Sequence, residues 1–96
     1  NMNIKKLYRR AINVYGPTHQ LGMLAEECGE LTQRLMKVIN RGEPPSYKLF
    51  EEIVDVEILI EQMREIFSDE AIDDIKDKKL QRLKKRVAKR EGRNDR

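Results

Sequence analysis

The stretch LFEEIVDVEIL, residues 49–59, places acidic side chains inside a run of large apolar residues. Apolar residues between Leu49 and Phe67 cover most of the circumference of the predicted helix, so we expect this helix to be buried on more than one side. Removing an ionised carboxylate from water is costly. The positions of Glu52 and Asp55 therefore require an explanation, either a bound cation or a partner charge.

Three breaks divide the chain into four predicted helices. The breaks fall at residues 16–18, 41–46 and 68–70, where glycine can end one helix and Thr or Ser can cap the next. The predicted helices span residues 3–15, 18–41, 46–67 and 69–90. Because the loops are short, we expect an all-α fold, a four-helix antiparallel bundle. Residues 2–90 form its single domain, and residues 91–96 are expected to be a frayed basic tail.

The helix predicted over residues 18–41 carries one apolar stripe. Its members recur at three- and four-residue steps and are Leu21, Leu24, Cys28, Leu31, Leu35 and Val38. Cys28 is therefore predicted to be buried as a small apolar residue. A chain of 96 residues buries only about 60 to 65% of the surface that its unfolded form exposes. A second copy is the simplest additional partner, which predicts a homo-oligomer, a dimer or a tetramer.

Charge is segregated along the chain. Residues 1–75 contain 9 Lys/Arg and 14 Asp/Glu, a net charge of −5, whereas residues 76–96 contain 11 Lys/Arg and 3 Asp/Glu, a net charge of +8. The basic segment alone would suggest nucleic acid as a partner, but it lacks interleaved aromatic residues, and the body is acidic. A non-catalytic helical dimer that binds nucleic acid or a protein through its basic C-terminal helix is therefore the alternative interpretation.

The location expected from the sequence is cytoplasmic. The single cysteine cannot form an internal disulfide, and the chain has no apolar run approaching about 18 residues. We therefore expect no membrane association.

Two acidic motifs lie on consecutive predicted helices. The first is Glu26-Glu27-x-x-Glu30 and the second is Glu52-x-x-Asp55. At about 100° per residue, Glu27 and Glu30 flank the apolar stripe of their helix, whereas Glu26 points nearly away from it. Two helices packed about 8 to 10 Å apart would bring the other four carboxylates toward one gap.

Four converging carboxylates repel one another unless a cation neutralises them. Ligation by carboxylate oxygens suits a hard divalent cation, Mg²⁺ first and Mn²⁺ as a possible substitute. The competing explanation is a set of salt bridges from these acids to Arg34, Lys37 or the basic tail.

With these motifs, the chain resembles the MazG-type nucleoside triphosphate pyrophosphohydrolases, an all-α superfamily whose hallmark is EExxE followed after a spacer by ExxD. The resemblance covers residues 15–86 and includes HQLGMLAEECGELTQRL and LFEEIVDVEILIEQM. It implies a Mg²⁺-dependent enzyme that cleaves a nucleoside triphosphate to the monophosphate and pyrophosphate. The metal ligands that it implies are Glu27, Glu30, Glu52 and Asp55.

The resemblance also implies a lysine and an arginine on the following helix that bind phosphate groups. The segment KDKKLQRLKKR offers Lys79 or Lys78 together with Arg82. Both spacings keep the lysine and the arginine on one face of a helix.

Glu26, Gln20 and a second role for Glu30 complete the predicted site. Glu26 or Glu30, if not fully committed to the metal, could accept a proton from the attacking water as the catalytic base. Gln20 lies two helical turns before Glu27 and could face the same cleft as a substrate-binding residue. The chain has no Trp to stack on a base, so a complete pocket is expected to need residues from a neighbouring subunit.

Overall fold

The computed structural model describes residues 1–92 and contains four helices and no strands in that range. The helices are α1 (Ile4–Tyr15), α2 (Pro17–Arg41), α3 (Tyr47–Ile66) and α4 (Asp69–Arg90). The prediction of an all-α chain is confirmed, and each helix boundary lies within one residue of the predicted one. The prediction of a frayed tail falls largely on residues 93–96, which lie outside the described range. None of these helices is long and apolar enough to span a membrane.

The helix ends are set by local capping. Gly16 and Gly42 have φ angles of 94° and 66°, which glycine adopts at little cost, and Gly42 ends α2 in the left-handed conformation. Ser46 and Ser68 accept hydrogen bonds from backbone N–H groups in the first turns of α3 and α4. These local contacts explain why the sequence alone locates the helices.

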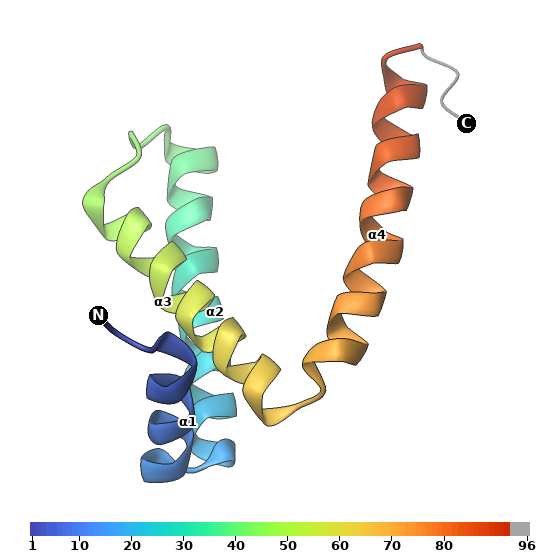
Figure 1. The fold of residues 1–96 in the computed structure, drawn as a ribbon. Helices are drawn as coiled ribbons and strands as arrows, with labels where there is room; N and C mark the ends of the chain where they lie inside the picture. The colour runs from blue at the N-terminus through green and yellow to red at the C-terminus, as the bar shows by residue number, and fades with distance from the viewer. Residues whose placement is uncertain (93–96) are drawn as a thin grey trace.

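The body of the molecule consists of α1, α2 and α3, and the most extensive contact joins α2 to α3 (Figure 1). One face of α3 points into this body. Its buried residues recur at three- and four-residue steps and are Leu49, Glu52, Val56, Leu59, Gln62 and Met63. The small core of the single chain is therefore built around one face of α3, and two of the six residues on that face are polar.

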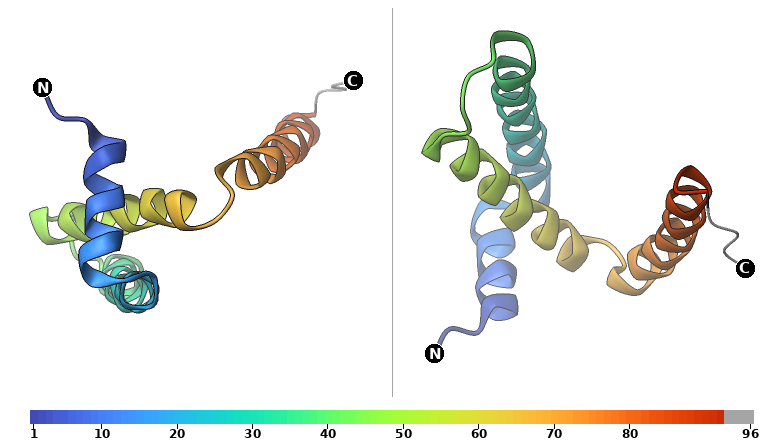
Figure 2. Two further views of the ribbon diagram at one scale, coloured as in Figure 1. Left: turned by 60° about the horizontal axis from the view of Figure 1, so that its bottom comes forward. Right: turned by 90° about the horizontal axis from the view of Figure 1, so that it is seen from above.

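α4 does not complete a four-helix bundle within the chain. It leaves the end of α3 as a separate arm (Figures 1 and 2) and, among residues 1–92, contacts α3 but neither α1 nor α2. Arg64 of α3 donates hydrogen bonds to Asp69 and Asp73 at distances of 2.8 and 2.6 Å, which holds the first turns of α4 at this junction. The expected antiparallel packing of all four helices is therefore not formed by one copy.

The prediction that Cys28 is buried is wrong, because the side chain is exposed. α3 crosses α2 obliquely (Figure 2), so it covers only part of the stripe on α2. Leu24 and Leu31 are partly buried, whereas Leu21 and Leu35 are about 40% exposed. The apolar period located the correct side of the helix, but the crossing angle decides which residues on that side are covered.

Candidate metal centre

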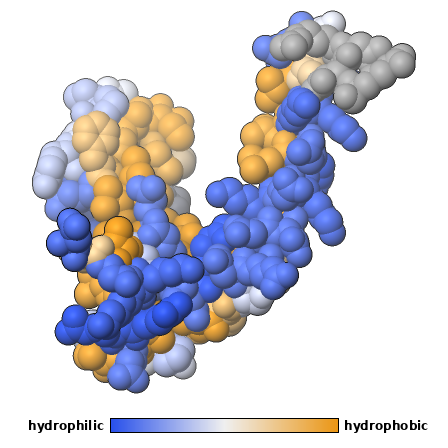
Figure 3. Space-filling view, viewed as in Figure 1, coloured by the Kyte–Doolittle hydropathy of each residue, from blue (hydrophilic) through white to orange (hydrophobic). Residues whose placement is uncertain are grey.

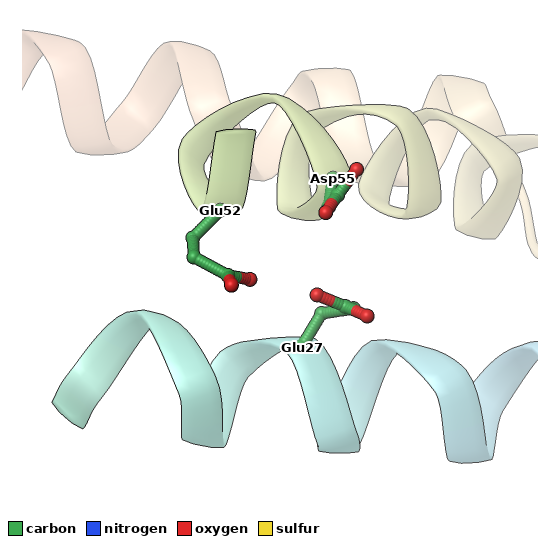
Figure 4. A group of neighbouring side chains, drawn as sticks. All are labelled: Glu27, Glu52 and Asp55. Atoms are coloured by element: carbon green, nitrogen blue, oxygen red, sulfur yellow. The ribbon is translucent and has the colours of Figure 1, made fainter. Parts of the chain in front are cut away.

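Three of the predicted acids meet at the contact between α2 and α3. Glu27 projects from α2 toward Glu52 and Asp55 on α3 (Figure 4), and one carboxylate oxygen of each lies within 4.8 Å of the others. Glu52 and Asp55 are three residues apart, so the helical period places both on the side of α3 nearest to α2. The group defined by these three residues is called the acid triad below.

Glu52 is the most buried member of the acid triad, and its side chain is only 3% exposed. One of its oxygens, Oε1, lies 3.5 Å from Nζ of Lys48, one turn earlier on the same helix. The suggested salt bridges to Arg34 and Lys37 are not among the ion pairs of residues 1–92, in which neither Glu27 nor Asp55 has a basic partner. One lysine at the edge therefore faces three acids.

Two carboxylate oxygens of the acid triad are buried without a hydrogen-bond partner. They are Oε2 of Glu27 and Oε2 of Glu52. Burial, the neighbouring carboxyl group of Glu52 and the negative charges of Glu30 and Asp55 together raise the pKa of Glu27 to about 7. Lys48 alone does not balance the three acids, and the site therefore favours either a proton on Glu27 or a cation.

The two remaining acids of the first motif lie outside the triad. Glu30 is exposed and lines a polar pocket of about 230 Å³ with Glu52 and Lys48. Its charge still contributes to the raised pKa of Glu27, so it lies at the margin of the site. Glu26 is also exposed, which agrees with its predicted direction away from the apolar stripe.

The side chain of Gln20 is buried between α2 and α3 and is not open to solvent. Its Nε2 donates a 2.7 Å hydrogen bond to Oε1 of Gln62, and its Oε1 lies 2.8 Å from Nδ1 of His19. Gln20 and Gln62 are each only 5% exposed. In one copy the Gln20 amide is therefore engaged in a contact between α2 and α3, and its predicted role in substrate binding would require that contact to open.

The predicted phosphate-binding residues are not brought to the acid triad by one copy. Lys78, Lys79 and Arg82 are exposed on α4, which makes no contact with α2 in the described part of the chain. Any contribution from these residues to the triad must come from a different arrangement of α4 or from another copy.

Two residues of the site were not predicted, although the sequence contains a signal for each. Lys48 lies four residues before Glu52, the spacing of an ion pair along one helix face. Gln62 lies three residues after Leu59 and four before Ile66, a spacing that places this polar side chain on the same helix face as apolar residues.

The chemistry available to this arrangement is the binding of a hard cation. Three carboxylates converge within bonding reach of one ion, and the ligating atoms are all oxygen. Among residues 1–92 no histidine or cysteine takes part in a group of this kind, so the donor set does not resemble a zinc site.

Comparison with protein-family models, curated proteins and solved structures finds no match to this chain.

The raised pKa of Glu27 predicts how stability depends on pH when divalent cations are removed. A carboxyl group whose pKa is raised on folding from 4.5 to about 7 binds its proton more tightly in the folded state. Its contribution to stability is fully present below pH 4.5 and is lost as the pH rises through about 7. In EDTA, the melting temperature should therefore fall across this range.

Thermal unfolding followed by circular dichroism measures this trend. Glu27→Gln should flatten the dependence, whereas the matched variant Glu26→Gln, at the exposed neighbouring position, should keep it. An unchanged slope in Glu27→Gln would show that Glu27 is not the titrating group.

Proposed function

We propose that the protein is a Mg²⁺-dependent nucleoside triphosphate pyrophosphohydrolase that converts a ribo- or deoxyribonucleoside triphosphate to the monophosphate and pyrophosphate. The proposal combines the resemblance of the two acidic motifs to the MazG-type enzymes with the geometry of the acid triad. Mn²⁺ is the expected substitute metal.

The observation that carries the proposal is the pair of buried, unpartnered carboxylate oxygens on Glu27 and Glu52. A buried acceptor without a partner is costly, and a second carboxylate beside it adds repulsion. A divalent cation bound by Glu27, Glu52 and Asp55 would relieve both costs. Its binding requires Glu27 to be ionised, so the metal competes with the proton that burial favours.

The residues around the triad have separate roles in this proposal. Glu27, Glu52 and Asp55 would hold Mg²⁺, which would supply charge neutralisation for the phosphate oxygens and a lowered pKa for a bound water. Glu30, which lines a pocket with Glu52 and contributes to the raised pKa of Glu27, would accept the proton of the attacking water, and Glu26 is the second choice. Lys79 or Lys78, together with Arg82, would bind the outer phosphate oxygens once α4 lies near a triad.

A panel of nucleoside triphosphates incubated with and without Mg²⁺ tests the proposal. We expect release of pyrophosphate and the monophosphate in equal amounts from at least one nucleotide, with Mg²⁺, and none in EDTA. Orthophosphate should appear only after inorganic pyrophosphatase is added. Direct release of orthophosphate, or no release from any canonical or modified nucleotide, would refute the proposed reaction.

A further inference from the structure

Two basic residues of the body, and not those of α4, lie beside the acid triad in one copy of the chain. The α4 arm is hydrophilic along most of its visible surface and stands apart from the body across an open gap (Figure 3). Among residues 1–92, α4 makes no contact with α2. Arg34 on α2 and Lys48 on α3, by contrast, line one pocket together with Glu52 of the triad.

The pocket that contains these two basic residues is lined by charged and amide side chains only. Its volume is about 230 Å³, and its lining residues are Glu30, Gln33, Arg34, Lys48 and Glu52. Sites for drug-sized organic ligands are mostly apolar and have volumes from about 300 Å³ upward. A smaller pocket without an aromatic or aliphatic residue therefore suits a small charged group. We call it the Arg34 pocket.

Arg34 has the properties of an anion-binding residue. Its side chain is partly buried, and it takes part in none of the ion pairs of residues 1–92, although Glu30 lies four residues earlier on the same face of α2. A guanidinium group has five N–H donors in a planar fork, which matches two oxygens of a phosphate group. A partly buried guanidinium group that pairs with no carboxylate in the described part of the chain therefore points to an anionic ligand.

Lys48 can also reach a ligand in the Arg34 pocket. Its Nζ lies 3.5 Å from Oε1 of Glu52, and its side chain is 53% exposed. A charge-assisted hydrogen bond is shorter, about 2.7 to 2.9 Å, so this contact leaves the donors of the ammonium group available. Because Glu52 belongs both to the Arg34 pocket and to the acid triad, an anion in the pocket would lie beside a cation held by the triad.

The charges around the Arg34 pocket predict that an anion binds only together with a divalent cation. Within the pocket, Arg34 and Lys48 are balanced by Glu30 and Glu52. The other two members of the acid triad, which are both ionised at pH 8, leave an excess of two negative charges. This excess repels an anion, and one Mg²⁺ ion cancels it.

We propose that the Arg34 pocket binds the phosphate chain of the substrate beside a Mg²⁺ ion held by the acid triad, with Arg34 in bidentate contact with phosphate oxygens and Lys48 as a second cation. One chain would then have phosphate-binding cations of its own, before any contribution from α4. The assignment of the ligand to a nucleoside triphosphate rests on the proposed function. The binding of a phosphate anion with Mg²⁺ depends only on the charges and shape of the pocket.

Isothermal titration calorimetry of the full chain with inorganic pyrophosphate at pH 8 tests the Arg34 pocket. The wild-type protein should bind pyrophosphate in excess Mg²⁺ and not in EDTA. Arg34→Gln should raise the dissociation constant at least about tenfold, because it removes charged donors. Arg34→Lys should restore only part of the affinity, since an ammonium group cannot make the bidentate contact. The matched control Arg41→Gln, at an exposed position about two turns later on the same side of α2, should bind pyrophosphate as the wild type does.

The melting temperature separates a loss of binding from a loss of folding. Mg²⁺ alone should raise it equally in the wild type and in the Arg34 variants, because the acid triad is unchanged. Loss of this rise in both Arg34→Gln and Arg34→Lys would assign Arg34 to the fold and overturn the proposal. Wild-type protein that does not bind pyrophosphate with Mg²⁺, or equal affinities in Arg34→Gln and Arg41→Gln, would also overturn it.

Failure of the pocket and failure of the proposed reaction give different results. Pyrophosphate binding that depends on Arg34, without hydrolysis of any nucleotide, would support the Arg34 pocket and refute the proposed reaction. Hydrolysis of a nucleotide to the monophosphate and pyrophosphate, with unchanged pyrophosphate affinity in Arg34→Gln, would support the reaction and refute the pocket.

Discussion

Glu52→Gln and Asp55→Asn are each expected to lower the Mg²⁺-dependent release of pyrophosphate by at least about 100-fold, while circular dichroism still reports a helical protein. Each substitution keeps the size of the side chain but removes one charged ligand from the acid triad. Because Glu52 is buried beside Glu27, its replacement also removes one of the charges that repel each other when no cation is bound.

The binding of Mg²⁺ provides a second measurement that does not depend on activity. Mg²⁺ should raise the melting temperature of the wild-type protein at pH 8, and Glu52→Gln should lose this shift. Glu57→Gln is the matched control, because Glu57 lies on α3 five residues after Glu52 and is exposed. If Glu52→Gln retained wild-type activity and the full Mg²⁺ shift, the acid triad would not be a metal centre.

Gln62→Met is expected to destabilise the protein by about 1 to 3 kcal/mol, because it leaves the buried Nε2 donor of Gln20 without its acceptor. Methionine is unbranched and similar in length to glutamine, so the change removes polarity and little volume. Gln20→Met should destabilise for the complementary reason, by leaving Oε1 of Gln62 without its donor.

The double variant distinguishes a coupled pair from two independent contributions. Since Gln20→Met with Gln62→Met removes both polar groups, its cost should be smaller than the sum of the single costs by about 0.5 kcal/mol or more. Denaturant unfolding measures these free energies, and Gln33→Met, at an exposed position of α2, controls for the substitution itself. Additive costs would show that the Gln20–Gln62 hydrogen bond contributes little to the contact between α2 and α3.

Much of the candidate site follows from the sequence because the helical period is a local property. The three-residue spacing of Glu52 and Asp55 fixes their common face, and the position of Glu27 beside the apolar stripe directs it to the same side. The helical period does not indicate which of Glu27 and Glu30 is buried against α3. Both flank the stripe, and the angle at which α3 crosses α2 leaves Glu30 exposed.

The sequence by itself determined the four helices and their ends, because capping residues and backbone hydrogen bonds act within a few positions of the chain. The tertiary structure decided which surfaces are covered. The oblique crossing of α2 and α3 exposes Cys28 and joins Gln20 to Gln62, and the Arg64 contacts set α4 apart from the body. These features depend on how side chains from distant positions pack together, and the spacing of residues along one helix does not by itself determine that packing.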